Sequence, residues 1–194
     1  MPPRSLPLQP GPRTPTYKEF CAKWENGCGA EECSRARKVV QARGKIPADV
    51  LFLGEAPGAS EDVLGVPFKG PAGELLQRII DDSVPEDVRY CLMNMVGCIP
   101  TDDDGDKSGE PTDEQIIQCK PRTIELFDLI KPRLIICVGK VASTWTDYKY
   151  LHAVIKRSEI PRIEIIHPAS IMRSTIAVKG LQIQTAVVKI ANAI

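Results

Sequence analysis

The sequence predicts an α/β fold in which helices cover both faces of a parallel sheet. Four short apolar runs, of the kind that forms strands buried on both faces, lie at residues 49–53, 88–96, 133–138 and 162–166. Segments with helical periodicity separate these runs, and strands that alternate with helices form a parallel sheet. The chain has 194 residues, 43% of them hydrophobic, and no internal repeat. This is enough for one α/β domain.

The chain divides into a short arm, residues 1–15, and a single domain, residues 16–194. The arm contains six prolines and no apolar periodicity, which predicts disorder. Further helices are expected over 17–24, 72–82, 112–129, 141–148 and from about 178 to the last residue. In the third of these, Thr112 and Gln115 have the spacing of a capping box. Its inward face is expected to carry Ile116, Ile117, Leu126 and Ile130.

The stretch that follows the first predicted strand carries the strongest functional signal. Gly54 to Gly58 is rich in glycine and proline, which favours a sharp turn with exposed backbone N–H groups. An acidic pair, Glu61 and Asp62, comes next, and Phe68 then lies in a Gly/Pro-rich loop. A glycine- and proline-rich turn by itself most simply has a structural role. A carboxylate, an aromatic side chain and a helix start in one segment favour a ligand site.

Three of the predicted strands end at residues that carry chemistry. Glu55 follows the first strand, Asn94 lies near the end of the second, and His167 follows the fourth. The carboxyl ends of parallel strands lie at one edge of the sheet. We therefore expect a carboxylate, an amide and an imidazole to converge there.

Charge and hydropathy narrow the choice of partner and compartment. The formal net charge is zero, but residues 1–46 carry +5, residues 47–148 carry −10 and residues 149–189 carry +5. The basic residues of the two ends would attract phosphates if they formed one face of the molecule. If they were scattered, they would be ordinary hydrated charges on the surface. The acidic loop at 101–110 lacks the EF-hand spacing and is interpreted as solvated. No apolar run reaches membrane length, so the expected location is cytoplasmic, in association with the nucleoid.

The seven cysteines fall into two groups. Cys91 and Cys137 lie inside apolar runs and are expected to be buried small hydrophobes. The others lie in polar or turn-like surroundings, which makes them candidate metal ligands: Cys21, Cys28, Cys33, Cys98 and Cys119. Four thiolates suit either zinc or an iron–sulfur cluster, and the residues alone leave that choice open.

Four motifs in register resemble the family 4 uracil-DNA glycosylases, which carry an iron–sulfur cluster. They are GEAPGASED, GVPFKGPAGELL, MNMVGC and IIHPASIMRS, and the resemblance spans roughly residues 28–190. It implies a three-layer α/β/α sandwich around a four-stranded parallel sheet. It also implies hydrolysis of the bond between uracil and deoxyribose in DNA by base flipping, the step that initiates base excision repair. The implied partner is uracil-containing DNA, single- or double-stranded, bound by a monomer.

The resemblance implies a role for each motif residue. Glu55 and His167 would be catalytic, with Asp62 as the alternative carboxylate. Gly54, Pro57, Phe68 and Asn94 would bind the base, and Ser170, Ile171, Met172 and Arg173 would bind DNA, with Ile171 or Met172 as the wedge. A 4Fe–4S cluster would be held by Cys28, Cys33, Cys98 and Cys119. Cys21 could replace one of the first pair, because four residues separate Cys28 and Cys33 where the family usually has two.

The chain also departs from the family pattern. Gly97 stands where the family commonly has Lys, Met93 where it commonly has Thr, and acidic residues occupy 102–106. All three changes remove favourable contacts with phosphates. The alternative function is therefore a catalytically inactive glycosylase-like module that binds DNA or protein.

Overall fold

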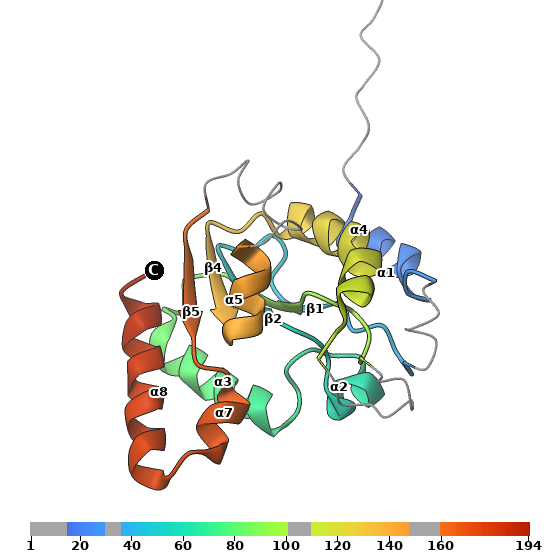
Figure 1. Ribbon diagram of the computed structural model, residues 1–194. Helices are drawn as coiled ribbons and strands as arrows, with labels where there is room; N and C mark the ends of the chain where they lie inside the picture. The colour runs from blue at the N-terminus through green and yellow to red at the C-terminus, as the bar shows by residue number, and fades with distance from the viewer. Residues whose placement is uncertain (1–14, 30–35, 101–109, 148–159) are drawn as a thin grey trace, which may run out of the picture.

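The computed structural model of the chain describes residues 15–29, 36–100, 110–147 and 160–194, and its centre is a five-stranded sheet (Figure 1). The strands are β1 (Ala42–Gly44), β2 (Val50–Gly54), β3 (Tyr90–Asn94), β4 (Leu134–Val138) and β5 (Arg162–Ile165). Their order across the sheet is β1-β3-β2-β4-β5, and β2 to β5 are mutually parallel. The four predicted strands are confirmed.

The expectation of a purely four-stranded parallel sheet is wrong, because β1 adds an antiparallel edge. Ala42 pairs with Met93 and Gly44 pairs with Cys91. This strand is three residues long and none of its residues is buried. A segment this short has no apolar alternation, so the sequence carried no strand signal there.

Seven helices are present in the described ranges. They are α1 (Tyr17–Lys23), α2 (Ala59–Leu64), α3 (Pro71–Ser83), α4 (Asp113–Ile130), α5 (Lys140–Asp147), α7 (Pro168–Arg173) and α8 (Ile176–Ala191). The five predicted helices are confirmed, whereas the sequence predicted no helix at α2 or α7. Both have only six residues, too few to show a helical repeat.

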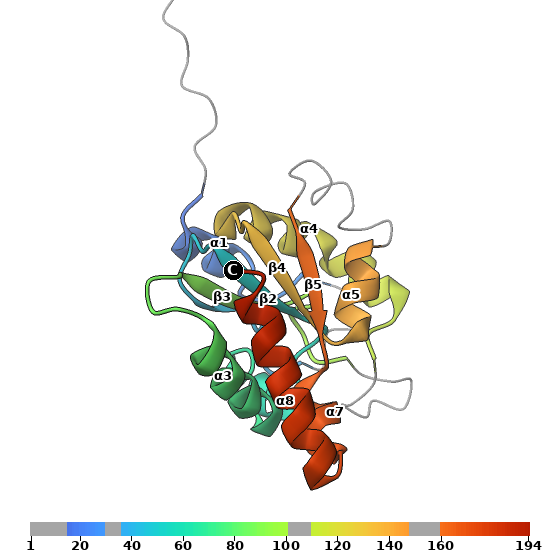
Figure 2. The same ribbon diagram turned by 90° about the vertical axis from the view of Figure 1, so that its left-hand side faces the viewer.

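The sheet is covered on both faces, so the molecule has three layers. Leu51, Leu53 and Met93 point to one face and pack with α1, α4 and α5, whereas Phe52 and Leu92 point to the other and pack with α3, α7 and α8. Figures 1 and 2 show α3 beside α8 on one face and α1 beside α4 on the other. The alternation follows from the two-residue period of a strand.

The capping box of α4 is confirmed: Gln115 N–H donates to Thr112 Oγ1, and the Thr112 N–H donates to Gln115 Oε1. Its predicted inward face is correct for Ile116, Leu126 and Ile130 and wrong for Ile117, which is 47% exposed. Adjacent helical residues point about 100° apart, and at this position the rotation turns Ile117 away from the core while Ile116 stays in it.

Cys91 and Cys137 are buried, as predicted. Several other expectations concern residues outside the described ranges: the arm at 1–14, Cys33 and the acidic loop at 101–109. None of the helices in the described ranges is long and apolar enough to cross a membrane.

Candidate active site at the carboxyl ends of the strands

Asn94 and Phe68 converge on Gly54, at the carboxyl ends of β2 and β3. Gly54 is in register with Asn94 across the two parallel strands. A Cβ added to Gly54 would collide with Asn94 Oδ1 and would lie 2.5 Å from Phe68 Cζ. Asn94 is 3% exposed, no described residue forms a hydrogen bond with its side-chain amide, and the polar atoms of that amide are not completely buried. An amide and an aromatic ring therefore lie side by side where only glycine fits.

The backbone of Phe68 is held in an unusual conformation. Its φ angle is 56°, in the left-handed region that large side chains rarely adopt. Gly73 in the first turn of α3 permits this, because any Cβ there would collide with the Phe68 backbone. Non-glycine residues in such conformations cluster at functional sites.

Two charged side chains hold the loop around Phe68. Glu61 accepts hydrogen bonds from the N–H groups of Gly58, Lys69 and Gly70, each at 3.0 Å. Arg43 of β1 donates to the carbonyl of Pro67 at 3.2 Å and to that of Phe68 at 3.5 Å. Another of its N–H groups donates to Gln77 Oε1 at 2.9 Å, which connects the loop to α3.

The sequence reading assigned no role to Glu61 or Arg43. The spacing from Gly58 to Glu61, three residues apart at a helix start, was a usable signal because a Glu at this position can accept a hydrogen bond from the N-cap N–H, which is one half of a capping box. Arg43 gave none, because its partners lie 24 to 34 residues away.

Glu55 follows β2 directly and is half-buried. Its carboxylate forms no hydrogen bond to the described residues, so it is open to a ligand or water. Burial raises the pKa of Glu55, and the Glu110 carboxylate raises it further. Pro57, in the turn after it, is buried.

Asp62 is placed differently from Glu55. It is 2% exposed on α2 and accepts a 2.7 Å hydrogen bond from the Arg37 N–H. The contact attaches residues 36–40 to α2. Of the two carboxylates proposed to act on water, Glu55 is the accessible one.

His167 caps the amino end of α7 and lies against the end of β4. Its Nδ1 accepts a hydrogen bond from the Ala169 N–H at 3.2 Å. The side chain packs on Gly139, whose φ is +96° and where a Cβ would lie 3.0 Å from His167 Cβ and 3.2 Å from its Cδ2. Burial lowers the pKa of His167, and the charge of Arg173 lowers it further. The ring is therefore neutral near pH 7, and with Nδ1 as acceptor its proton belongs on Nε2.

The predicted DNA-binding residues form α7. Ile171 is fully buried in the core with α3 and α8, whereas Met172 is 42% exposed. Arg173 is exposed and donates to Ser170 Oγ at 3.2 Å. Of the two candidate wedge residues, Met172 is the one at the surface.

The thiols proposed as metal ligands lie around Gly97. Cys98 and Cys119 are 5% and 3% exposed, and the Gly97 N–H donates to Cys119 Sγ at 3.2 Å. A Cβ on Gly27 would lie 3.8 Å from Cys98 Sγ. The half-buried Cys28 is the next residue in the chain after Gly27. In the described ranges no group of three or more His, Cys, Asp or Glu side chains is arranged to hold a metal.

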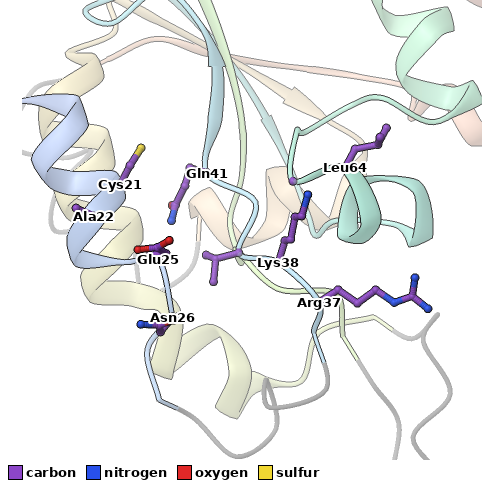
Figure 3. Close-up of a pocket in the computed structure, with 10 residues that line it drawn as sticks. Cys21, Ala22, Glu25, Asn26, Arg37, Lys38, Gln41 and Leu64 are labelled. Carbon is purple, nitrogen blue, oxygen red and sulfur yellow. The ribbon is translucent and has the colours of Figure 1, made fainter.

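Cys21 occupies a different place, on α1. Its side chain interacts with the hydroxyl of Tyr17, whose pKa is raised by burial and by this neighbour. It also lines an open pocket of about 650 Å³ between α1 and the segment of Arg37 and Lys38 (Figure 3). Glu55, Asn94 and His167 do not line this pocket.

Comparison with known proteins decides the family. The model of the Uracil DNA glycosylase superfamily matches residues 42–190, which include β1 to β5 and every strand-end residue above. The chain belongs to this superfamily.

Several curated type-4 uracil-DNA glycosylases are similar in sequence to this chain. That of Saccharolobus solfataricus is 33% identical over 66% of this chain and 56% of its own length. That of Thermotoga maritima is 34% identical over 54% of this chain and 52% of its own length. The resemblance seen in the motifs is confirmed. The chain spans about half the length of these curated relatives.

A structural relative supports the fold. The crystal structure of wild-type Pedobacter heparinus SMUG2 superposes with a TM-score of 0.54 at 13% sequence identity. The match covers 73% of this chain and 74% of that chain. At this identity the likeness shows a shared fold alone.

Proposed function

We propose that the chain hydrolyses the N-glycosidic bond of uracil in DNA and so initiates base excision repair. The observation that carries this proposal is the convergence of Asn94 and Phe68 on Gly54 at the strand ends. Uracil in a duplex is inaccessible, so the nucleotide must first be flipped out of the stack. The ring of Phe68 then offers a stacking surface for the base. Gly54 lets the base approach the backbone.

Asn94 selects uracil in this proposal. Its Oδ1 accepts from uracil N3–H while its Nδ2–H donates to O4. Cytosine presents the reverse pattern at these two positions. This role is supported by the free hydrogen-bonding groups of Asn94: no described residue binds its side-chain amide, so both Oδ1 and Nδ2 are available to a base.

His167 stabilises the leaving base. When the glycosidic bond breaks, its electron pair goes to uracil, which leaves as an anion, and the sugar becomes an oxocarbenium ion. The hydrogen bond from Ala169 to Nδ1 supports a neutral ring with a proton on Nε2. A neutral donor strengthens its hydrogen bond as charge develops on uracil O2, which lowers the barrier.

Glu55 acts on the sugar side of the bond. As an anion it stabilises the oxocarbenium ion, and it orients the water whose oxygen attacks C1′ and whose proton it accepts. Its half-burial and its lack of a protein partner support this role. Asp62, buried and bound to the Arg37 backbone, instead holds α2 in place.

A 4Fe–4S cluster held by Cys28, Cys33, Cys98 and Cys119 completes the proposal. The described thiols fit such a group chemically, because Cys98 approaches Gly27 and Cys119 receives a backbone N–H, as ligand sulfurs commonly do. When bound, the cluster supplies a cross-link between the N-terminal loop and the loop after β3. Met172, Arg173 and Ser170 of α7 would contact the DNA, and the protein would act as a monomer.

The test is cleavage of oligonucleotides that carry a single uracil, followed by alkali to break the abasic site. The parent protein should act on U·G, U·A and single-stranded uracil but not on cytosine. Asn94→Asp should lose uracil excision by about 10- to 100-fold, since a carboxylate cannot donate to O4. Exposed Asp82→Asn is the matched control. Binding of uracil DNA without cleavage would favour the inactive binding module instead.

A further inference from the structure

Arg122 is a fully buried cation without a counter-charge in the described protein. Its side chain is 1% exposed and lies on α4, one turn after Cys119. In the described ranges no carboxylate forms an ion pair with it, and its Nη1 is a buried nitrogen without a hydrogen-bond partner. A guanidinium remains charged in proteins, and burying an unpaired charge is costly.

The other donors of Arg122 bind the segment that precedes β1. Nη2 donates to the Val40 carbonyl at 2.6 Å, and Nε donates to Gln41 Oε1 at 2.8 Å. These neutral acceptors fix the position of the guanidinium but do not neutralise it. The guanidinium is therefore fixed in a buried position with its charge unneutralised by these partners and its Nη1 without an acceptor.

The guanidinium lies against Gly97, which is adjacent to one proposed cluster ligand and hydrogen-bonded to another. The guanidinium lies over Gly97, where an added Cβ would be 2.7 Å from Arg122 Nε and 2.8 Å from its Cζ. Gly97 precedes Cys98 and donates its N–H to Cys119 Sγ, and its carbonyl accepts from the Val40 N–H. Arg122 therefore lies on the helix that carries Cys119 and contacts the segment that carries Cys98.

We infer that Arg122 is the counter-charge of the iron–sulfur cluster and raises its reduction potential. The inference rests on the cluster proposed above. Four thiolates give such a cluster a net negative charge, and nearby charge and hydrogen bonds to sulfur set its potential. One-electron reduction makes the cluster more negative, so a neighbouring cation stabilises the reduced state. Removing that cation must lower the potential.

Arg122→Met removes the charge and donors while keeping an apolar chain of similar length. In the cluster-loaded protein, we expect the equilibrium constant for one-electron reduction to fall about tenfold, a potential about 59 mV lower. Arg122→Lys keeps the charge and should stay near the parent value. Gln41→Met is the matched control, because it breaks a hydrogen bond of the same guanidinium but leaves the cation. Film voltammetry measures all four proteins.

The outcomes separate the two proposals. A parent protein without iron and sulfide would overturn the cluster itself. A loaded Arg122→Met protein with the parent potential would overturn only the role of Arg122. If Arg122→Met does not fold, Arg122→Gln, which also removes the charge, takes its place. A lower potential in Arg122→Gln with a parent-like potential in Arg122→Lys supports the inference, and a parent-like potential in Arg122→Gln, or equal lowering in the lysine and Gln41→Met variants, overturns it.

Discussion

His167 combines a neutral imidazole with a defined tautomer, which makes its contribution to the reaction testable. We expect His167→Ala to lower the single-turnover rate about 100- to 1,000-fold, the usual effect of removing one donor to a developing anion. Binding of DNA with an uncleavable uracil analogue should change little, because the hydrogen bond strengthens only in the transition state. Equal losses of rate and binding would instead make His167 a residue for folding or binding.

The two titratable site residues also predict the pH dependence of the rate. In the proposed mechanism Glu55 and His167 both act in their deprotonated forms, so the rate should fall as the pH falls. Burial raises the pKa of Glu55 and lowers that of His167, so the acid limb should lie above the ordinary value of a glutamate. Single-turnover rates from pH about 4 to 8 measure this limb. A rate that rises below the ordinary histidine pKa would contradict the assignment.

At the scale of elements, the loop between α2 and α3 depends on one carboxylate. Glu61→Gln replaces an oxygen that accepts from backbone N–H groups of Gly58, Lys69 or Gly70. We expect the free energy of unfolding to fall by about 1–3 kcal/mol, and kcat/KM to fall at least about tenfold as Phe68 loses its position. Urea denaturation and uracil excision measure the two effects.

The control for Glu61 is Glu86→Gln, which removes the same charge from an exposed position outside the helices and strands. It should leave both quantities within about 0.5 kcal/mol of the parent. Loss of stability without loss of kcat/KM in Glu61→Gln would show that the loop does not position Phe68.

At the scale of the whole molecule, the proposed cluster would join the N-terminal loop to the loop after β3 and to α4. Cys119→Ala should therefore abolish iron and sulfide binding and lower stability. Cys137→Ala, in the core of β4, should keep the metal and cost only about 1–2 kcal/mol of packing. Iron and sulfide analysis with thermal unfolding tests both. Retention of full iron by Cys119→Ala would exclude this thiol as a ligand.

The sequence alone determined the layered fold and the edge of the sheet that carries the site. Apolar runs and helical periodicity are local properties, so the four parallel strands and the five longer helices were readable residue by residue. The expectation that Glu55, Asn94 and His167 share one edge of the sheet followed from the common direction of those strands, and the three residues lie at or just after the carboxyl ends of β2, β3 and β5. Short elements such as β1 were missed because they contain no full repeat.

Only the tertiary structure decided which side chains hold that site together. Arg43 binds the carbonyls of Pro67 and Phe68 from a strand that the sequence did not reveal. Arg122 binds Gln41 and Val40, which precede it by 81 and 82 residues. It also decided that Ile171 is core while Met172 faces outward. Contacts between distant segments leave no periodicity in a single sequence. Burial and unpaired charge become visible only when the chain is folded.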